Sequence, residues 1–123
     1  MTAGKDSAAT IREVLATVDR KDAEGFVAFL TKDARFRFGN AEAVTGQAEI
    51  RDAVAGFFTS IASLSHHIDR IWTTPEAVAC DGEVTYLRHD GLEIRLPFAD
   101  VFGMRGGKID EYLIYIDISP LYA

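Results

Sequence analysis

In the second half of the chain, the pattern of apolar residues predicts long β-strands. Apolar residues occupy both sets of alternating positions in these strands, so both faces of the strands carry them. Three strands are expected there, at residues 77–87, 92–104 and 109–118. Asp90-Gly91 and Gly106-Gly107 separate these strands and predict two-residue hairpin turns. In the middle strand Leu96 and Phe98 occupy one phase, while Val101 occupies the other. A sheet with one wet face would alternate apolar and polar residues, so both faces of this sheet are expected to be covered.

The first half of the chain carries apolar residues at the three-and-four spacing of helical stripes. Helices are predicted at residues 7–20, 22–30 and 46–61. Ser7 and Asp22 are placed to cap the first two of them. A short alternating strand is predicted at residues 33–38, and a further strand at residues 64–73. Helices that precede an antiparallel run of strands indicate an α+β domain, with the helices packed on one face of the sheet.

Long twisted strands would curl around these helices into a cone, whose mouth is a natural pocket for a small molecule. On the last strand, Leu113 and Tyr115 lie in the phase opposite Tyr112 and Ile114, which extends the apolar band on the outer face. A chain of 123 residues supplies helices for one face only. The outer face is therefore expected to meet a second copy of the chain in a homodimer.

The composition is typical of a single globular domain spanning residues 1–123, with 48% hydrophobic and 26% charged residues. The net charge of −6 disfavours nucleic acid and anionic membranes as partners. The first residues lack the apolar core of a signal peptide, and no apolar run is long enough to span a bilayer. A cytoplasmic location is therefore expected. The single cysteine, Cys80, is interpreted as a small buried hydrophobic residue.

Four segments of the sequence, with the order of the predicted elements, resemble the NTF2-like superfamily and, within it, the SnoaL-like proteins related to ketosteroid isomerase. The matching segments are residues 22–38, 45–50, 96–102 and 107–112. The resemblance implies a cone-shaped, curved antiparallel or mixed sheet wrapped around the N-terminal helices. It also implies a small apolar organic ligand and no cofactor. It leaves the activity open, because this scaffold carries isomerases, cyclases, hydrolases, dehydratases and non-catalytic binding proteins.

Ketosteroid isomerases use a carboxylate base, a tyrosine and a protonated aspartic acid, and the resemblance assigns only one of these roles here. Asp100 matches the protonated acid, whereas Phe38 stands at the position of the base and Val14 at that of the tyrosine. Limonene-epoxide hydrolases use an Asp-Arg-Asp trio, and Ile114 stands where one of its acids is expected. Neither mechanism is therefore expected to operate unchanged in this chain.

Asp100 is the leading candidate for chemistry, because it lies in an apolar strand between Ala99 and Val101. If it points into the cone, Phe98 and Phe102 lie beside it, and burial should raise its pKa. A carboxylic acid that is kept neutral in this way can act as a general acid or as an oxyanion donor. The alternative is a structural acid that is bonded to backbone amides or to a hydroxyl.

Two residues are candidates for the proton partner of Asp100. The phase of the strand at residues 64–73 is expected to point the His66 ring inward and the His67 ring outward. A two-residue hairpin at Asp90-Gly91 would bring Glu83 onto the inner face, although a shift of one residue would turn it outward. The alternatives are a bonded core histidine and a solvated or paired glutamate.

The other predicted ligand contacts come from inward positions on the strands, where aromatic rings offer an apolar substrate a surface for stacking. They are Tyr112, which would orient the ligand, and Phe36, Phe38, Thr85, Phe98, Phe102 and Ile114. No His-x-His or Glu-x-x-His pattern is present, so no metal site is expected.

The sequence thus favours cofactor-free acid–base chemistry on a small apolar organic molecule, such as isomerisation, cyclisation or hydration. The alternative is a non-catalytic module for ligand binding or dimeric interaction. A pocket in which an acid and a base converge would favour the enzyme. A cone filled by Phe38, Phe57 and Phe102 would favour the binding module.

Overall fold

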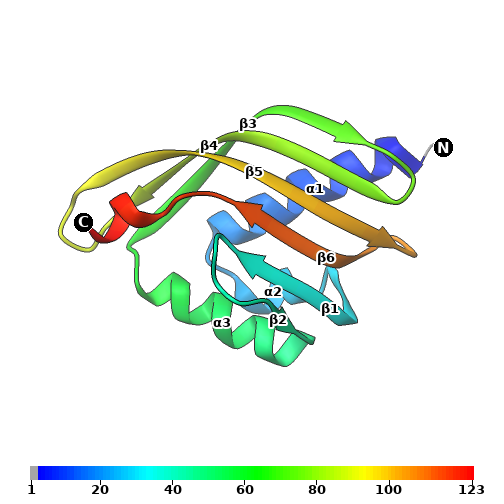
Figure 1. The fold of residues 1–123 in the computed structure, drawn as a ribbon, viewed down its shortest axis with the longest axis horizontal. Coiled ribbons are helices and arrows are strands. Elements are labelled where there is room, and N and C mark those ends of the chain that lie inside the picture. The colour runs from blue at the N-terminus through cyan, green and yellow to red at the C-terminus, as the bar shows by residue number, and fades with distance from the viewer. Residues whose placement is uncertain (1–2) are drawn as a thin grey trace.

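The structure is a computed structural model that describes the backbone of residues 3–123 and the side chains of residues 7–123. Three helices and a six-stranded sheet make up the fold (Figure 1), which confirms the predicted α+β class. The elements are α1 (Ala3–Asp19), α2 (Ala23–Val27), β1 (Leu30–Phe38), β2 (Val44–Thr45), α3 (Gln47–Thr59), β3 (Ser63–Thr73), β4 (Ala77–Leu87), β5 (Glu93–Arg105), β6 (Lys108–Tyr115) and a final 3₁₀ turn (Ser119–Tyr122).

The strands follow the order β2-β1-β6-β5-β4-β3 across the sheet. Strands β3 to β6 form the predicted antiparallel meander, whereas β1 pairs with β6 in parallel, so the sheet is mixed. The helices lie against one face of the sheet, with α1 crossing behind β3, β4 and β5 in Figure 1. This arrangement leaves an inner face that is covered by helices and an outer face that no described helix covers.

The two hairpins of the meander that were predicted as two-residue turns differ in length. The turn between β5 and β6 is the predicted two-residue turn, because Arg105 pairs with Lys108 and both Gly106 and Gly107 have positive φ angles. The predicted two-residue turn at Asp90-Gly91 is wrong. Leu87 pairs with Glu93, so five residues, 88–92, connect β4 to β5. This loop is closed by the amide of residue 88, which donates to the carbonyl of residue 92 at 2.9 Å.

The first helix also differs from the prediction at its start. Helix α1 begins at Ala3, so Ser7 lies inside the helix and does not cap it. The second helix begins as predicted, because the Asp22 carboxylate accepts a hydrogen bond of 2.9 Å from the amide of Gly25. Lys21, with a φ of 58°, makes the tight turn between the two helices.

The hydrophobic core lies between the helices and the inner face of the sheet. Each helix contributes a buried stripe to it, represented by Ile11 of α1, Phe26 of α2 and Ile50 of α3. These stripes pack on inward strand residues such as Val84 and Phe102, which are also buried. These contacts join the three helices to the inner face of the sheet.

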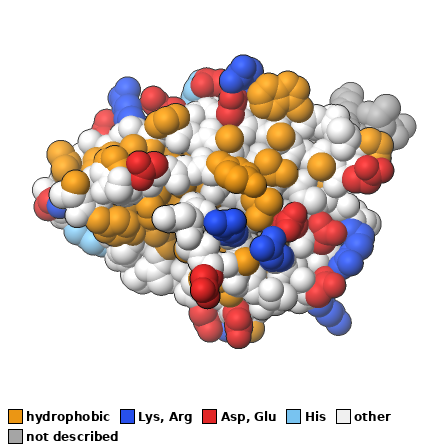
Figure 2. All heavy atoms as spheres, in the orientation of Figure 1, with side chains coloured by type: hydrophobic (Ala, Val, Ile, Leu, Met, Phe, Trp, Pro, Cys, Tyr) orange, Lys and Arg blue, Asp and Glu red, His pale blue; other side chains and the backbone are white. Residues whose placement is uncertain are grey.

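The outer face carries a row of apolar side chains that crosses four strands. Trp72 pairs with Ala79, Ala79 with Val101, and Val101 with Leu113. Trp72 is 51% exposed. Figure 2 shows hydrophobic side chains gathered over β4, β5 and β6 in the middle of this face, with charged groups around them. The predicted apolar band on the outer face is therefore present, while the homodimer remains a prediction.

Candidate functional site

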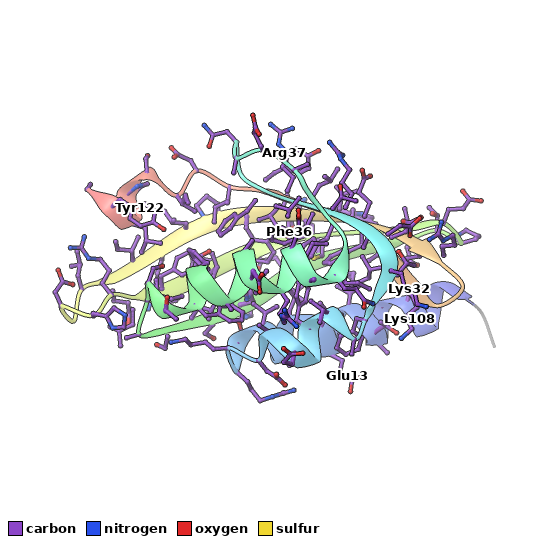
Figure 3. All side chains as sticks on the ribbon, turned by 90° about the horizontal axis from the view of Figure 1, so that it is seen from below. Glu13, Lys32, Phe36, Arg37, Lys108 and Tyr122 are labelled. Atoms are coloured by element: carbon purple, nitrogen blue, oxygen red, sulfur yellow. The ribbon has the colours of Figure 1, made fainter. Side chains whose placement is uncertain are left out.

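A cavity of about 240 Å³ lies between the inner face of the sheet and the helices. Phe36 of β1 lines this space, while the next residue, Arg37, points away from the helices (Figure 3). Nearly all lining side chains are aliphatic or aromatic, as is usual for pockets that bind small organic molecules. The lining residues with polar groups are Glu42, His66, Tyr86 and Tyr112.

This cavity is lined by most of the residues that the sequence predicts as ligand contacts. They are Phe36, Phe38, Phe98, Tyr112 and Ile114. Phe102 does not reach it, because its ring is fully buried and stacks on the ring of Tyr112 at 4.3 Å between centroids. Phe38 and Phe57 pack edge to face at 4.8 Å and form part of the cavity wall without filling it.

The predicted inward position of Glu83 and Thr85 is wrong. In the observed register Glu83 lies opposite Pro97 and is exposed, while Thr85 lies opposite Arg95. The inward residues of β4 are their neighbours, among them Val84 and Tyr86, which line the cavity. The cause is the hairpin, because a five-residue loop in place of a two-residue turn shifts the pairing by one residue and reverses every side chain.

Asp100 is buried as predicted, with only 1% of its surface exposed. The hydroxyl of Tyr112 donates a hydrogen bond of 3.0 Å to its Oδ2 atom. Its Oδ1 atom has no hydrogen-bond partner among the described residues. Burial raises the pKa of Asp100 to about 7, although the charge of His66 and the hydrogen bond from Tyr112 act in the opposite direction. Asp100 does not line the cavity. It is linked to the cavity by its hydrogen bond with Tyr112, which is a lining residue.

His66 points inward as predicted. Its side chain is 11% exposed, against 80% for the neighbouring His67. Its Nδ1 atom lies 2.6 Å from Oδ1 of Asp19, and the other carboxylate oxygen of Asp19 accepts the backbone amide of His66 at 3.0 Å. The edge of the His66 ring also packs against Phe98, with centroids 5.1 Å apart. These contacts fix the ring and leave Nε2 as its unbonded nitrogen within the described structure.

Asp19 is a candidate site residue that the sequence did not indicate. It is the last residue of α1 and lies 47 positions from His66, so no local spacing connects the two. One weak signal exists, because an acid at the C-terminal end of a helix meets the negative end of the helix dipole. Such a placement is locally unfavourable and is compensated here by the bonds to His66.

Tyr86 is a polar lining residue of the cavity that was not predicted. Its ring packs edge to face on Phe57 at 5.8 Å, and burial together with the nearby acids Asp100 and Asp19 raises its pKa. Tyr112 is neutral for the same reason, since burial and Asp100 hold its pKa well above the ordinary value. Both tyrosines are therefore hydroxyl groups, and neither is a phenolate, at neutral pH.

Within the part of the chain that the structure describes, no three histidine, cysteine, aspartate or glutamate side chains come together in a way that could hold a metal ion. None of its helices is long and apolar enough to cross a membrane. The polar groups at the cavity are thus two acid-linked pairs, His66 with Asp19 and Tyr112 with Asp100, together with Tyr86 and Glu42.

Residues 11–112 match the family model of the SnoaL-like domain, which is most of the chain. The chain belongs to the SnoaL-like family. No curated protein matches its sequence. Solved structures of SnoaL-like and NTF2-like proteins share its fold at low sequence identity, and the NTF2-like architecture expected from the resemblance is confirmed.

Three of these structures illustrate the range of the fold. A proposed SnoaL-like polyketide cyclase from Jannaschia sp. CCS1 is 14% identical, with a TM-score of 0.85 over 99% of this chain and 92% of the other. An NTF2-like protein of unknown function from Burkholderia pseudomallei is 20% identical, with a TM-score of 0.85 over 98% and 95%. An LEH-like epoxide hydrolase from M. tuberculosis is 15% identical, with a TM-score of 0.83 over 98% and 90%. At these identities the likeness establishes the fold alone.

Proposed function

We propose that this SnoaL-like protein is a cofactor-free enzyme that moves a proton on a small, uncharged and mostly apolar organic molecule. The observation that carries the proposal is a single apolar cavity served by two acid-linked pairs, His66–Asp19 and Tyr112–Asp100. His66 comes from β3 and Tyr112 from β6, which are separated in the sheet by β4 and β5. A bound molecule can therefore meet a base and a hydrogen-bond donor at different points.

His66 has the features of a general base. A carboxylate only accepts hydrogen bonds, so the bond to Asp19 places the ring proton on Nδ1 and leaves a lone pair on Nε2. In the proposed step, Nε2 takes a proton from the carbon next to a carbonyl group. The electron pair of the broken C–H bond then moves to the carbonyl oxygen and forms an enolate.

Tyr112 and Asp100 supply the hydrogen-bond donor for the enolate oxygen. An enolate oxygen is stabilised by a donor held in a water-poor site, where such a bond is stronger than in water. The Tyr112 hydroxyl is such a donor when neutral Asp100 donates to its oxygen. With a β,γ-unsaturated ketone the enolate is a dienolate, and return of the proton from His66 to its γ-carbon re-forms the carbonyl group and completes an isomerisation without a cofactor.

The cavity also supports an expectation about the ligand. No lysine or arginine lies among its lining residues, and Glu42 is the only acidic one. An anionic ligand would lose its hydration without gaining a cationic partner. The proposal rests on the cavity and its two pairs.

A direct test is catalysed hydrogen exchange in a bicyclic ketone. In D₂O the protein should accelerate deuterium uptake at the carbon next to the carbonyl group of 2-tetralone, followed by mass spectrometry or NMR. His66→Gln should slow this exchange by about 100-fold or more, because a positioned general base contributes that much. His67→Gln is the matched control, since this neighbouring histidine lies on the outer face and should leave the rate unchanged.

Asp19→Asn tests the positioning role of the carboxylate. The amide can donate to Nδ1 and would then stabilise the tautomer whose Nε2 carries the proton, so kcat should fall while KM stays nearly constant. Exchange that is equally fast in His66→Gln would rule out His66 as the base. Tight binding of 2-tetralone without any catalysed exchange would instead support the non-catalytic ligand-binding module.

We also propose that the outer apolar face, defined as Trp72, Ala79, Val101 and Leu113, joins two copies of the chain. Both signs of charge border the row, including the pairs Arg35–Glu111 and Arg70–Asp81. A surface that offers both signs is suited to a twofold contact with its own copy, in which each patch meets itself. A stable dimer would bury on the order of 1,200 Å² or more in total.

Light scattering coupled to size-exclusion chromatography should give twice the chain mass of 13.5 kDa at micromolar concentration. Leu113→Glu should shift the protein to the monomer, because it places a charge in the middle of the apolar row. Ser65→Glu, on an exposed outward position of β3 outside the row, should leave the dimer intact. A wild-type protein that elutes as a monomer would refute the proposal.

A further inference from the structure

We propose that Asp100 and Tyr112 together select the polar group of the ligand. The Tyr112 hydroxyl donates a hydrogen bond into the cavity when Asp100 is neutral, and it can only accept one when Asp100 is ionised. This inference deepens the proposed function and rests on the same cavity. It concerns which ligands bind, however, and it can be tested without any turnover.

The argument starts from the single proton of the Tyr112 hydroxyl, which lies 3.0 Å from Oδ2 of Asp100. An ionised carboxylate has no proton to give, so the hydroxyl must donate to it and presents only lone pairs elsewhere. A neutral carboxyl group can reverse the bond and donate to the hydroxyl oxygen. The proton of Tyr112 is then free to point at a carbonyl oxygen in the cavity.

The surroundings of Asp100 favour the neutral form and keep the ionised form within reach. Its Oδ1 atom is buried without a hydrogen-bond partner in the described structure, which is costly for a charged carboxylate. Burial raises the pKa of Asp100 to about 7, so both forms are populated in the neutral range. The hydrogen bond with Tyr112 is buried as well, so no bulk water competes for either partner.

Other titratable or charged groups around this pair come from three elements. They are Cys80 and Tyr86 on β4, His66 on β3, and Arg12 and Asp19 on α1. Burial raises the pKa of Cys80 to about 12 and that of Tyr86 above its ordinary value, so both stay neutral. Arg12 acts on Cys80, and Asp19 bonds to His66. His66 is the charged group whose effect on the pKa of Asp100 opposes burial, so it needs its own control.

The consequence for the ligand is a change of preference with pH. When Asp100 is neutral, the cavity favours molecules whose polar group accepts, such as ketones and esters. When Asp100 is ionised, a carbonyl oxygen would face the lone pairs of Tyr112 and lose its partner, which weakens binding. A hydrocarbon of the same shape makes no such bond and should bind equally well in both states.

The experiment compares methyl 2-naphthoate with naphthalene by isothermal titration at pH 5.5 and pH 8.5. The ester accepts hydrogen bonds but cannot donate, and it has no enolisable hydrogen. We expect its affinity relative to naphthalene to fall about tenfold between the two pH values, as the loss of one buried hydrogen bond predicts. Naphthalene corrects for any general change of the cavity with pH.

Three variants show which side chain causes the pH dependence of ester binding. Asp100→Asn keeps a donor toward Tyr112 at every pH, so the ester should bind well and without pH dependence. Tyr112→Phe removes the hydroxyl, so the ester should bind no better than its hydrocarbon shape allows at either pH. His66→Gln should retain the change but move it to higher pH, because the charge of His66 lowers the pKa of Asp100.

The outcomes distinguish this inference from the proposed function. A pH dependence that persists in Asp100→Asn or disappears in His66→Gln assigns the effect to His66 and overturns the inference. A wild-type protein that binds both probes with no change in their ratio overturns it too, while leaving proton transfer by His66 intact. Failure of both probes to bind at any pH would overturn the cavity as a ligand site, and the proposed function with it.

Discussion

Asp100→Asn is expected to be more stable than the wild-type protein at pH 8, by on the order of 4 kcal/mol in the free energy of unfolding. The folded protein holds the pKa of Asp100 at about 7, against 3.8 for an unperturbed aspartate, and each pKa unit corresponds to about 1.4 kcal/mol. The stability that the neutral acid contributes is complete below the unfolded value. It is lost as pH rises toward the folded value, because the unfolded state has then released its proton while the folded state still holds it.

Asparagine removes this loss, since it has the shape of neutral aspartic acid and never ionises. Urea denaturation of both proteins between pH 4 and pH 8.5 would measure the effect as a difference in the free energy of unfolding. The difference between variant and wild type should grow steadily between about pH 4 and pH 7 and stay constant above that range. The difference, and not the wild-type curve alone, is the quantity to follow, because other carboxylates also titrate.

Asp81→Asn provides a control of the opposite sign. The hydrogen bond from Arg70 holds the pKa of Asp81 below its usual range, so its contribution to stability is present above the unfolded pKa and lost as pH falls. This variant should therefore lose stability relative to the wild type at neutral pH and regain it under acid conditions. A constant gap between Asp100→Asn and the wild type from pH 4 to pH 8 would mean that Asp100 ionises as an ordinary surface acid.

The burial of Asp100 could be predicted from the sequence because it depends on its own strand. Phe98 and Phe102 share its phase, and two-residue alternation carries all three to the same face of the sheet. The inward position of His66 follows from the same rule applied to β3. Periodicity of this kind is a local property, so a single sequence contains it.

The register between strands depends on the loops, and there the prediction failed. Asp90-Gly91 is a strong signal for a two-residue turn, yet the chain turns over residues 88–92. Arg88 and Asp90 form an ion pair at 2.7 Å, and the Asp90 carboxylate accepts the amide of Leu92 at 3.2 Å, which favours the wider loop. The resulting shift of one residue in the strand register places Val84 and Tyr86 at the cavity in place of Glu83 and Thr85.

The hydrogen bond between Asp19 and His66 could not be predicted from the sequence, for a different reason. It joins the end of α1 to the start of β3, and its existence depends on how the helix crosses the sheet. Lys21 reinforces this junction, because its ammonium group donates to the carbonyls of Ile61 and Ala62, just before β3 begins. Contacts of this kind become visible only once the layers are assembled.

Gly82→Ala is expected to destabilise the fold by about 3 kcal/mol or more, at the upper end of what overpacking costs. Gly82 lies on β4 opposite Ile68, next to the point where the pairing of β3 and β4 is irregular. A Cβ atom at this position would overlap the carbonyl oxygen of His67 and stand 3.0 Å from the Cα of Ile68. These are backbone atoms, so no rotation of a side chain can relieve the clash, and β3 itself must move.

Gly56→Ala is the matched control, with the same change and the opposite expected sign. Gly56 lies in α3, and nothing lies within 4 Å of a Cβ atom placed there. Alanine should therefore stabilise the protein by about 0.5–1 kcal/mol through its better helix propensity. Urea denaturation of the three proteins gives both values from one measurement.

The displacement in Gly82→Ala should also reach the site, because His67 follows His66 directly in the strand. A shift of β3 would pull the His66 ring and amide away from Asp19, whose two oxygens hold them at 2.6 and 3.0 Å. The NMR signals of the His66 ring in folded Gly82→Ala should thus change, while those in Gly56→Ala stay as in the wild type. If Gly82→Ala proved as stable as the wild type, β3 would have room to move away from β4. The His66–Asp19 pair would then be held by its own hydrogen bonds, with no help from the close approach of the two strands.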